Sequence, residues 1–342
     1  MLRTIHSFRL TTAVLLLAAC LITSAAFAQS YQLTKLVSNV TGATHTDKQL
    51  VNGWGIAYGP GQPFWVSDAG TGLSTLYDGT GVKQTLVVKI PTASGTGTGT
   101  PSGIVYNASS EFKIDTWTSA FIFATLDGTI SGWSNFSPKA ALLAVNNSGS
   151  HTSYTGLAIS SHTRGNLIFA ADNANNKIDV YDGTFNFVTS FTDKTVPAGF
   201  SVFGVQDIGG NVYVSYAAKN GGAGGYIDIF KENGVFVKRF AQGAPLNQPW
   251  GFAVAPAQFG PLSSTLLIAN ETPASTISGF NKTTGKLVGT MKDSTGKTIK
   301  IDRLWGIEFG GGTSSNGTKT QLFFAAGPKN YAQGLFGVIN FK

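Results

Sequence analysis

The sequence is nearly free of cysteine. Cys20 is the only cysteine among its 342 residues, and it lies in the N-terminal region. The chain beyond residue 28 can therefore form no disulfide and offers no thiolate nucleophile or cysteine-ligated metal. Charged residues are scarce as well, at 12% of the chain, and there are only four histidines. A fold built from this chain must rely on apolar burial and hydrogen bonding, and a chain of about 300 residues can bury roughly three quarters of its unfolded surface.

Long apolar runs are also lacking, with one exception near the N-terminus. Residues 10–22 are apolar, follow the basic residues Arg3 and Arg9, and precede small residues typical of a cleavage site. This order of basic, apolar and small residues is that of a secretory signal peptide. We therefore expect residues 1–28 to be a signal peptide and residues 29–342 to form one domain that is secreted or periplasmic.

A lipoprotein signal is the alternative, because Cys20 follows a leucine and two alanines. The residues after Cys20 are apolar, however, whereas a lipoprotein usually has a polar tether there, so plain secretion is favoured. The apolar run is shorter than the roughly 20 residues that span a bilayer. No second run of that length follows, and we expect no transmembrane segment.

Positive charge is in modest excess. The formal net charge is +7, and removal of Arg3 and Arg9 with the signal would leave +5. Six basic residues lie within residues 282–303, but no interleaved aromatics or reading helix accompany them, as a nucleic-acid site would require. This stretch is expected to be a solvated outer strand and loop, with no nucleic-acid partner.

A repeat of about 50 residues runs through the chain after the signal. Each unit opens with a glycine followed by an apolar run, and successive glycines are 48, 53, 48, 47 and 55 residues apart. The six glycines are Gly55, Gly103, Gly156, Gly204, Gly251 and Gly306. A fixed period of this length is the signature of a solenoid, a propeller or a repeat array.

Each unit continues with further short runs of β-branched and aromatic residues bounded by turn residues, which predict strands. Second strands are predicted around residues 64–66, 121–123, 167–169, 212–214, 266–268 and 322–324, third strands around 74–77, 178–181 and 227–230, and fourth strands around 85–88 and 187–190. No helical periodicity follows the signal. Four strands per unit, repeated radially, form a propeller blade.

The sixth unit supplies only three strands, the last at residues 335–340. The extended run at residues 31–37 can supply its missing fourth strand, which would leave no unpaired seam in the ring. The sequence therefore predicts an all-β, six-bladed β-propeller closed by an N-terminal strand.

Two stretches carry a resemblance to known propellers. Residues 170–181 resemble the NHL repeat, with its aspartate, turn, asparagine and apolar pair, and residues 66–72 are a looser copy. More broadly, residues 33–340 resemble an uncharacterised bacterial family of exported NHL-like propellers, through strings such as Val51-Asn52-Gly53-Trp54-Gly55 and Gly334-Leu335-Phe336-Gly337. The C-terminal sorting tail of some members is absent. Relatives also tend to carry an acidic residue before the second string, where this chain has Tyr331-Ala332-Gln333, so no carboxylate function is expected there.

The aspartates of the NHL-like stretches, Asp68 and Asp172, precede tight turns. A carboxylate in such a place accepts backbone N–H groups and stabilises a hairpin, which is the role we expect. Asp172 with Asn175, Asn176 and Asp179 superficially resembles a calcium loop, but the spacing fails the EF-hand pattern.

The channel mouth is the candidate binding site. The first strand of each propeller blade lines the central channel, so the tryptophans that precede three of the repeated glycines are expected to lie near one another, with polar residues on the preceding loops. These residues would form either an amphipathic funnel for a ligand or a packed cluster between blades, and packing is favoured. They are Trp54, Trp250 and Trp305, with Asn52, Asn247 and Asp302.

Two polar residues break the apolar pattern of the inner strands. Gln206 and Glu308 stand two places after their glycines, where other blades carry alanine or valine. A carboxylate on an inner strand is costly unless it is paired. Glu308 either pairs with Arg303 or a lysine, or faces the channel as a cation ligand or base.

No catalytic motif of a hydrolase or phosphate-binding enzyme is present. We therefore expect a monomeric, non-enzymatic binding or interaction module for an unknown protein or a small-molecule or glycan ligand. The alternative is a metal-dependent hydrolase or lyase of the gluconolactonase-like type, with a divalent cation at the mouth. Three or four ligands would have to meet on the axis, and Asp207, Asp302 and Glu308 are the candidates. His45 and Asp47 form the only close histidine–carboxylate pair, interpreted as loop chemistry unless it lies at the mouth.

Overall fold

The computed structural model describes residues 30–160 and 166–342. The expected signal peptide with Cys20, and also His162, lie outside the described residues. Within these ranges the chain forms β-strands and three 3₁₀ turns, η1 (Ser148–Ser150), η2 (Lys219–Gly221) and η3 (Gly260–Leu262), and no α-helix. The predicted all-β class is confirmed.

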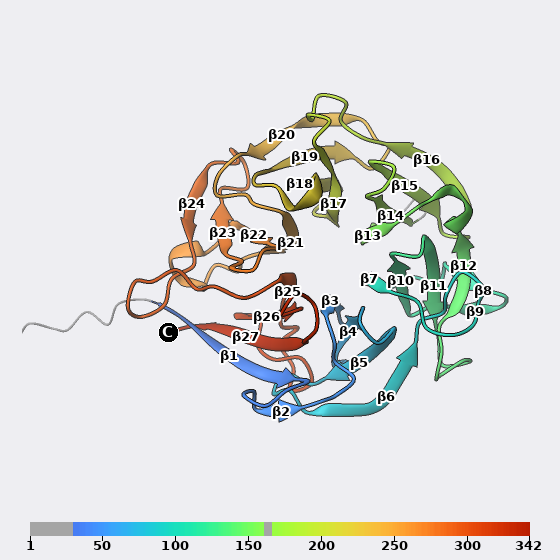
Figure 1. Cartoon of the computed structure of the whole chain (residues 1–342), viewed down its shortest axis with the longest axis horizontal. Helices are drawn as coiled ribbons and strands as arrows, with labels where there is room; N and C mark the ends of the chain where they lie inside the picture. Colours follow the sequence, from blue (N-terminus) through green and yellow to red (C-terminus); the bar gives the residue numbers. More distant parts are fainter. Residues whose placement is uncertain (1–29, 161–165) are drawn as a thin grey trace, which may run out of the picture.

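Six sheets are arranged radially around a centre (Figure 1). Blade 1 contains β3 (Gly53–Ala57), β4 (Phe64–Asp68), β5 (Leu73–Tyr77) and β6 (Lys83–Lys89). Blade 2 contains β7 (Pro101–Tyr106), β10 (Phe121–Thr125), β11 (Thr129–Trp133) and β12 (Leu142–Asn146). Blade 3 contains β13 (Tyr154–Ser160), β14 (Leu167–Asp172), β15 (Lys177–Asp182) and β16 (Phe187–Phe191). Blade 4 contains β17 (Phe200–Asp207), β18 (Asn211–Ala218), β19 (Gly225–Lys231) and β20 (Phe236–Gln242).

Blade 5 contains β21 (Pro249–Val254), β22 (Leu266–Asn270), β23 (Ile277–Phe280) and β24 (Leu287–Thr290). Blade 6 contains β25 (Leu304–Phe309), β26 (Gln321–Ala326), β27 (Leu335–Phe341) and β1 (Tyr31–Ser38). The repeat therefore predicted the number of blades and their strand order correctly. Two small additions were not predicted: the hairpin β8 (Lys113–Ile114) and β9 (Trp117–Thr118) in blade 2, and β2 (His45–Thr46), which pairs in parallel with β1.

The N-terminal strand closes the ring as predicted. β1 pairs antiparallel with β27 through seven register partners, from Tyr31 opposite Phe341 to Ser38 opposite Leu335. The Tyr31 hydroxyl also donates a hydrogen bond to the carbonyl of Phe259 at 2.7 Å and accepts one from the Leu262 N–H at 3.0 Å. These bonds tie blade 6 to blade 5. The first and last strands of the chain thus complete one sheet, and no blade is left with a missing strand.

Close contact between neighbouring blades explains the repeated glycine. A Cβ on Gly55 would lie 2.5 Å from the carbonyl oxygen of Ser102, and one on Gly251 would lie 2.5 Å from that of Trp305. Real side chains do not approach backbone this closely, so these inner strands can pack around the axis only with glycine here. The same holds for Gly103, Gly204 and Gly306, whereas a Cβ on Gly156 would meet its nearest atom at 3.2 Å.

The hydrophobic core is divided into six clusters, each formed between two neighbouring blades. The cluster between blades 6 and 1, for example, packs Phe64 and Tyr77 against Phe323 and Phe336. Second and third strands carry most of these buried rings, because both of their faces are covered by adjacent blades. A seventh cluster lies apart from these six, at the channel mouth, and includes Trp54 and Trp305.

Candidate functional site

Three tryptophans meet at one end of the central channel. Trp54, Trp250 and Trp305 begin the inner strands of blades 1, 5 and 6, which are consecutive in the ring. The rings of Trp54 and Trp305 are stacked, with centroids 3.6 Å apart, and the ring of Trp250 stands edge-on at 6.3 Å from the first and 5.9 Å from the second. Their shared place in the repeat predicts that these residues lie near one another, and the structure places them in direct contact.

This cluster closes the mouth instead of lining an open funnel. Trp54 and Trp305 are 5% and 2% exposed, while Trp250 is half-buried. Trp250 Nε1 donates a hydrogen bond of 2.8 Å to the carbonyl of Thr155 in blade 3, so its ring reaches across the mouth. The aromatic faces therefore pack mainly on one another, as the favoured interpretation held, although they pack across the axis and not as separate wedges between blades.

The three polar residues expected beside the tryptophans lie in different surroundings. Asn52 is buried and its Oδ1 accepts a hydrogen bond of 3.0 Å from Trp305 Nε1. Asn247 lines a large cavity at the mouth, and Asp302 lines a separate one beside it, where its Oδ2 accepts the Lys329 N–H at 2.9 Å. Of these three polar residues, the structure thus brings only Asn247 to the cavity at the mouth.

The cavity at the mouth, here called the mouth cavity, has a volume of about 520 Å³ and is lined by residues of blades 3 to 6. This volume is in the range of small-molecule sites. Phe203 and Trp305 form an aromatic floor, and polar side chains surround it. The polar lining residues are Asn173, Lys219, Asn220, Asn247, Gln248, Glu271, Thr272, Arg303 and Tyr331.

A buried carboxylate in this cavity was missed by the sequence analysis. Glu271 is 4% exposed, and its Oε1 accepts hydrogen bonds from Arg303 Nη1 at 3.1 Å and from the Tyr331 hydroxyl at 3.0 Å. The Arg303 guanidinium also lies over the Tyr331 ring, 4.8 Å from its centroid. Burial raises the pKa of Glu271, and the Arg303 charge opposes that rise. The resemblance argued against a carboxylate near Tyr331, but blade 5 supplies one.

A second position of the repeat could have indicated Glu271. It follows the last residue of β22, and the residues after the corresponding strands of blades 1 and 2 are Ala69 and Leu126, both in the tryptophan cluster. The corresponding residues of blades 3, 4 and 6 are Asn173, Lys219 and Gly327, and the first two line the mouth cavity together with Glu271. This position therefore points at the mouth, and its polar residues mark the cavity.

Left-handed backbone conformations are concentrated around the mouth. Asn52, Gln248 and Arg303 each stand two residues before a tryptophan and have φ values of 49°, 54° and 53°. The three consecutive residues Lys329, Asn330 and Tyr331 also have positive φ. Such conformations cost about 1 kcal/mol or more each outside glycine, and they tend to occur where a site demands them. Arg303 and Tyr331, which both have this conformation, both contact Glu271.

The channel beneath the tryptophans is narrow and holds the other polar exceptions. Gln206 and Glu308 line a space of about 40 Å³, enclosed by the inner strands. Within the described residues Glu308 has no ion pair, because Arg303 pairs with Glu271 and not with Glu308, contrary to one of the two expectations. Burial raises the pKa of Glu308 to about 7, opposed by a hydrogen bond from the Phe309 backbone. Glu308 therefore faces the channel, the other expectation.

The carboxylates proposed as metal ligands do not converge. Asp302 lines the cavity beside the mouth, Glu308 lines the channel, and Asp207 ends β17 beyond the channel-lining Gln206. The described ranges contain no group of three or more His, Cys, Asp or Glu side chains that could hold a metal ion.

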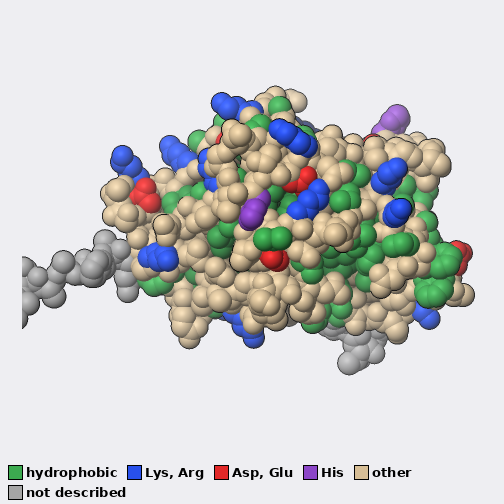
Figure 2. Space-filling model, turned by 90° about the horizontal axis from the view of Figure 1, so that it is seen from below, with side chains coloured by type: hydrophobic (Ala, Val, Ile, Leu, Met, Phe, Trp, Pro, Cys, Tyr) green, Lys and Arg blue, Asp and Glu red, His purple; other side chains and the backbone are tan. Residues whose placement is uncertain are grey.

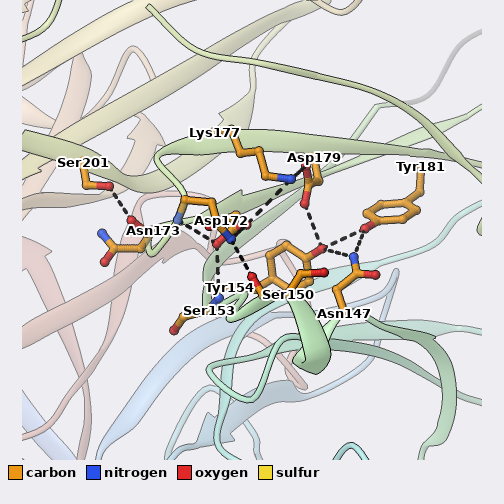
Figure 3. Close-up of polar contacts among 11 residues, drawn as sticks. Asn147, Ser150, Ser153, Tyr154, Asp172, Asn173, Lys177, Asp179, Tyr181 and Ser201 are labelled. Atoms are coloured by element: carbon orange, nitrogen blue, oxygen red, sulfur yellow. Dashed lines mark hydrogen bonds and ion pairs between the residues drawn. The ribbon is translucent and has the colours of Figure 1, made fainter.

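The turn aspartates have the structural role expected of them. Asp172 is fully buried; its Oδ1 accepts the backbone N–H groups of Ser153 and Asn175, and its Oδ2 accepts Asn175 Nδ2 at 2.7 Å (Figure 3). Lys177 Nζ lies 3.9 Å from Asp172 Oδ2 and 2.6 Å from Asp179 Oδ1. A lysine ammonium thus occupies the place where a calcium ion would have to bind. Asp68 acts similarly, accepting the Thr75 N–H and hydroxyl.

The remaining charged features lie away from the mouth. His45 is on β2 at the outer edge of blade 6, and Asp47 accepts hydrogen bonds from Tyr77 and Lys83, which hold its pKa below the usual range although burial opposes this. The five lysines of residues 282–300 are exposed. In Figure 2 basic side chains are scattered over the visible face and do not gather in one patch.

Comparisons with known proteins place the chain among β-propellers. No family model matches it. It is 31% identical over 333 residues to Uncharacterized protein R648 of Acanthamoeba polyphaga mimivirus, covering 91% of this chain and 80% of that protein. It is 28% identical to Uncharacterized protein L690 of the same virus, covering 90% of this chain and 85% of that protein.

Among the described residues, no helix is long and apolar enough to cross a membrane.

Solved structures share the fold at low sequence identity. A gluconolactonase from Xanthomonas campestris matches with a TM-score of 0.56 and 14% identity, over 86% of this chain and 87% of that one. A streptogramin B lyase matches with a TM-score of 0.54 and 13% identity, over 93% and 100%. A Bacteroides thetaiotaomicron protein of unknown function matches with 0.57 and 11%, over 91% and 76%. At these identities the likeness shows the fold alone.

Proposed function

From the premise that this chain belongs to the β-propeller family of Uncharacterized protein R648 of Acanthamoeba polyphaga mimivirus, we propose that it is a binding module whose ligand enters the mouth cavity. The cavity carries this proposal. It has about 520 Å³ of space, an aromatic floor and polar groups from four blades, a combination typical of small-molecule sites. Strained backbone around it holds those groups in fixed positions.

We also propose that the propeller is exported and NHL-like. The support is the basic–apolar–small pattern of residues 1–28 and the NHL-like turn of residues 170–181. Mass spectrometry of the secreted or periplasmic protein should find Gln29 at the N-terminus. A diacylated Cys20 would instead make the protein a membrane-anchored lipoprotein.

Blocking the mouth cavity tests the binding function. Ala223 lines the cavity and is exposed, so Ala223→Trp should fill space without disturbing the core. Ala257 is an exposed alanine in the loop after β21, outside the cavity, and Ala257→Trp is the matched control. The probes are neutral sugars, sugar acids, amino sugars and amino acids at millimolar concentration, detected by saturation-transfer NMR.

At least one probe should bind the wild type and the control and lose binding in Ala223→Trp. Binding that survives Ala223→Trp would place the site elsewhere. If no probe binds, the small-molecule function is wrong.

The metal-dependent alternative has one observation in its favour, the carboxylate of Glu308 in the channel, which forms no ion pair with the residues that the structure describes. It is tested by elemental analysis after gel filtration in metal-free buffer. A stoichiometric divalent ion that disappears in Glu308→Gln would support the alternative over the binding module.

A further inference from the structure

Only one of the two carboxylate oxygens of Glu271 accepts hydrogen bonds from the described residues. Its Oε1 accepts both the Arg303 and the Tyr331 hydrogen bonds, whereas Oε2 makes no hydrogen bond within residues 30–160 and 166–342. The residue is 4% exposed and lines the mouth cavity. Oε2 is not one of the fully buried polar atoms that lack a partner, so it is open to the cavity, where a ligand hydroxyl can donate a hydrogen bond to it.

The guanidinium of Arg303 has hydrogen-bond donors available to a ligand, where Glu271 has an acceptor. It has five N–H donors, and its bonds to protein are to Glu271 at 3.1 Å and to Asn330 Oδ1 at 3.4 Å. The side chain is 22% exposed and lines the same cavity. An acceptor and several donors therefore stand side by side, fixed relative to one another by their own ion pair.

The charges of Glu271 and Arg303 favour neutral ligands over charged ones. Glu271 and Arg303 neutralise each other, and Lys219 at the exposed rim adds one positive charge. A ligand carboxylate bound to Arg303 would lie beside the Glu271 charge, and a ligand ammonium bound to Glu271 would lie beside Arg303. Like charges at a few ångströms inside a cavity are costly. A neutral ligand with adjacent donors and acceptors avoids both penalties.

We propose that the mouth cavity binds a neutral carbohydrate, with two adjacent hydroxyl groups bridging Glu271 and Arg303; this rests on the proposed binding function. One hydroxyl donates to Glu271 Oε2, and its neighbour accepts from the Arg303 guanidinium. Asn247 makes no side-chain hydrogen bond with the described residues and lines the same cavity, so its amide is available to a further hydroxyl. Phe203, half-buried in the floor, offers an apolar surface to the C–H face of the sugar ring.

Glu271→Gln tests this assignment because it removes the charge and keeps the shape. The probes are glucose, galactose, mannose, maltose and cellobiose, with glucuronate and glucosamine as the charged comparisons, measured by saturation-transfer NMR and calorimetry. The wild type should bind at least one neutral sugar and neither charged one. Glu271→Gln should bind the neutral sugar roughly tenfold more weakly or worse, as expected for losing a hydrogen bond to a charged group, and should gain affinity for glucuronate because Arg303 is freed.

The control is Asp115→Asn, which makes the same charge change in an exposed turn of blade 2 and should leave all affinities unchanged. If Glu271→Gln does not fold, Tyr331→Phe replaces it. That variant removes one of the two bonds that orient Glu271 and should weaken sugar binding several-fold without creating glucuronate binding.

Two results would overturn the inference while leaving the binding function intact. One is preferential binding of glucuronate or glucosamine to the wild type, provided that Ala223→Trp blocks it. The other is neutral-sugar binding that Glu271→Gln, or Tyr331→Phe in its place, does not change. Absence of binding by every probe would contradict both proposals together.

Discussion

Trp250 in blade 5 donates its indole N–H to the backbone carbonyl of Thr155 in blade 3, across 2.8 Å at the channel mouth. The bond joins two blades that are not neighbours in the ring. It also holds the Trp250 ring edge-on to the stacked pair of Trp54 and Trp305. The tryptophans of blades 1, 5 and 6 thus close the mouth and are anchored to blade 3 by this hydrogen bond.

Two substitutions of Trp250 should distinguish how much its hydrogen bond and its packing each contribute to the free energy of unfolding. Trp250→Phe keeps an aromatic ring and should cost about 1 kcal/mol in the free energy of unfolding, the usual net value of one hydrogen bond. Trp250→Ala also removes the ring and should cost about 3 kcal/mol, the lower end for large aromatics, because Trp250 is only half-buried. Urea denaturation measures both, with the exposed Trp117→Ala as control. Equal values for the two Trp250 variants would mean that the ring contributes nothing.

Removing the closing strand should have a much larger effect. Deletion of residues 29–38 exposes the full hydrogen-bonding edge of β27, and such an edge promotes aggregation. A milder change, Tyr31→Phe, leaves the buried Phe259 carbonyl and Leu262 N–H without their partner and should cost about 1–3 kcal/mol. Tyr226→Phe is the control, since the Tyr226 hydroxyl makes no hydrogen bond within the described ranges and its ring, which contacts the Arg239 guanidinium, is kept. A soluble deletion variant with an unchanged melting temperature would refute closure by β1.

The turn of blade 3 should depend on its carboxylate and not on calcium. Asp172→Ala leaves the N–H groups of Ser153 and Asn175 unpaired and Lys177 with one fewer anionic neighbour. The expected loss is about 2–3 kcal/mol in unfolding free energy. Added calcium or a chelator should leave the melting temperature of the wild type unchanged. A rise in melting temperature with calcium that Asp172→Ala abolishes would show that the loop binds the ion.

The blade architecture could be predicted from sequence because its determinants are local and repeated. A glycine such as Gly251 is required wherever an inner strand meets the backbone of the next blade, so the requirement recurs at one spacing. The closing strand was predictable for a similar reason, since the sixth unit is one strand short. The hairpin β8–β9 and the strand β2 were missed because they are two residues long and occur once.

The candidate site was predictable only in part, because its contacts join residues from different blades. The meeting of Trp54 and Trp305 follows from their shared place in the repeat. The partner of Arg303 does not, because Arg303 lies in the left-handed turn just before β25 and pairs with Glu271 of the preceding blade, and not with Glu308 of β25. Asn52 was expected either at a funnel or in a packed cluster, and the structure shows it buried, with its Oδ1 accepting a hydrogen bond from Trp305 Nε1.

The last prediction concerns the pH dependence that Glu308 gives to stability. Its pKa is raised from 4.5 to about 7 in the folded protein, so the folded state binds the proton more tightly than the unfolded chain does. The stability contributed by the protonated form is fully present below about pH 4.5 and is lost as the pH rises through about 7. The cost of the buried charge above that pH is about 2–3 kcal/mol, allowing for partial hydration in the channel.

Glu308→Gln should therefore match the wild type at about pH 4 and exceed its unfolding free energy by about 2–3 kcal/mol at about pH 8. Urea denaturation across this range measures the difference, and Asp115→Asn, exposed and far from the channel, should show none. The other buried carboxylates contribute equally to the pH dependence of the wild type and the variant, so their contributions cancel in the difference. They include Asp228, whose pKa is also raised. A difference that stays near zero at every pH would mean that the Glu308 charge is compensated in solution. A bound cation would provide that compensation, so this result would favour the metal-dependent alternative over the binding module.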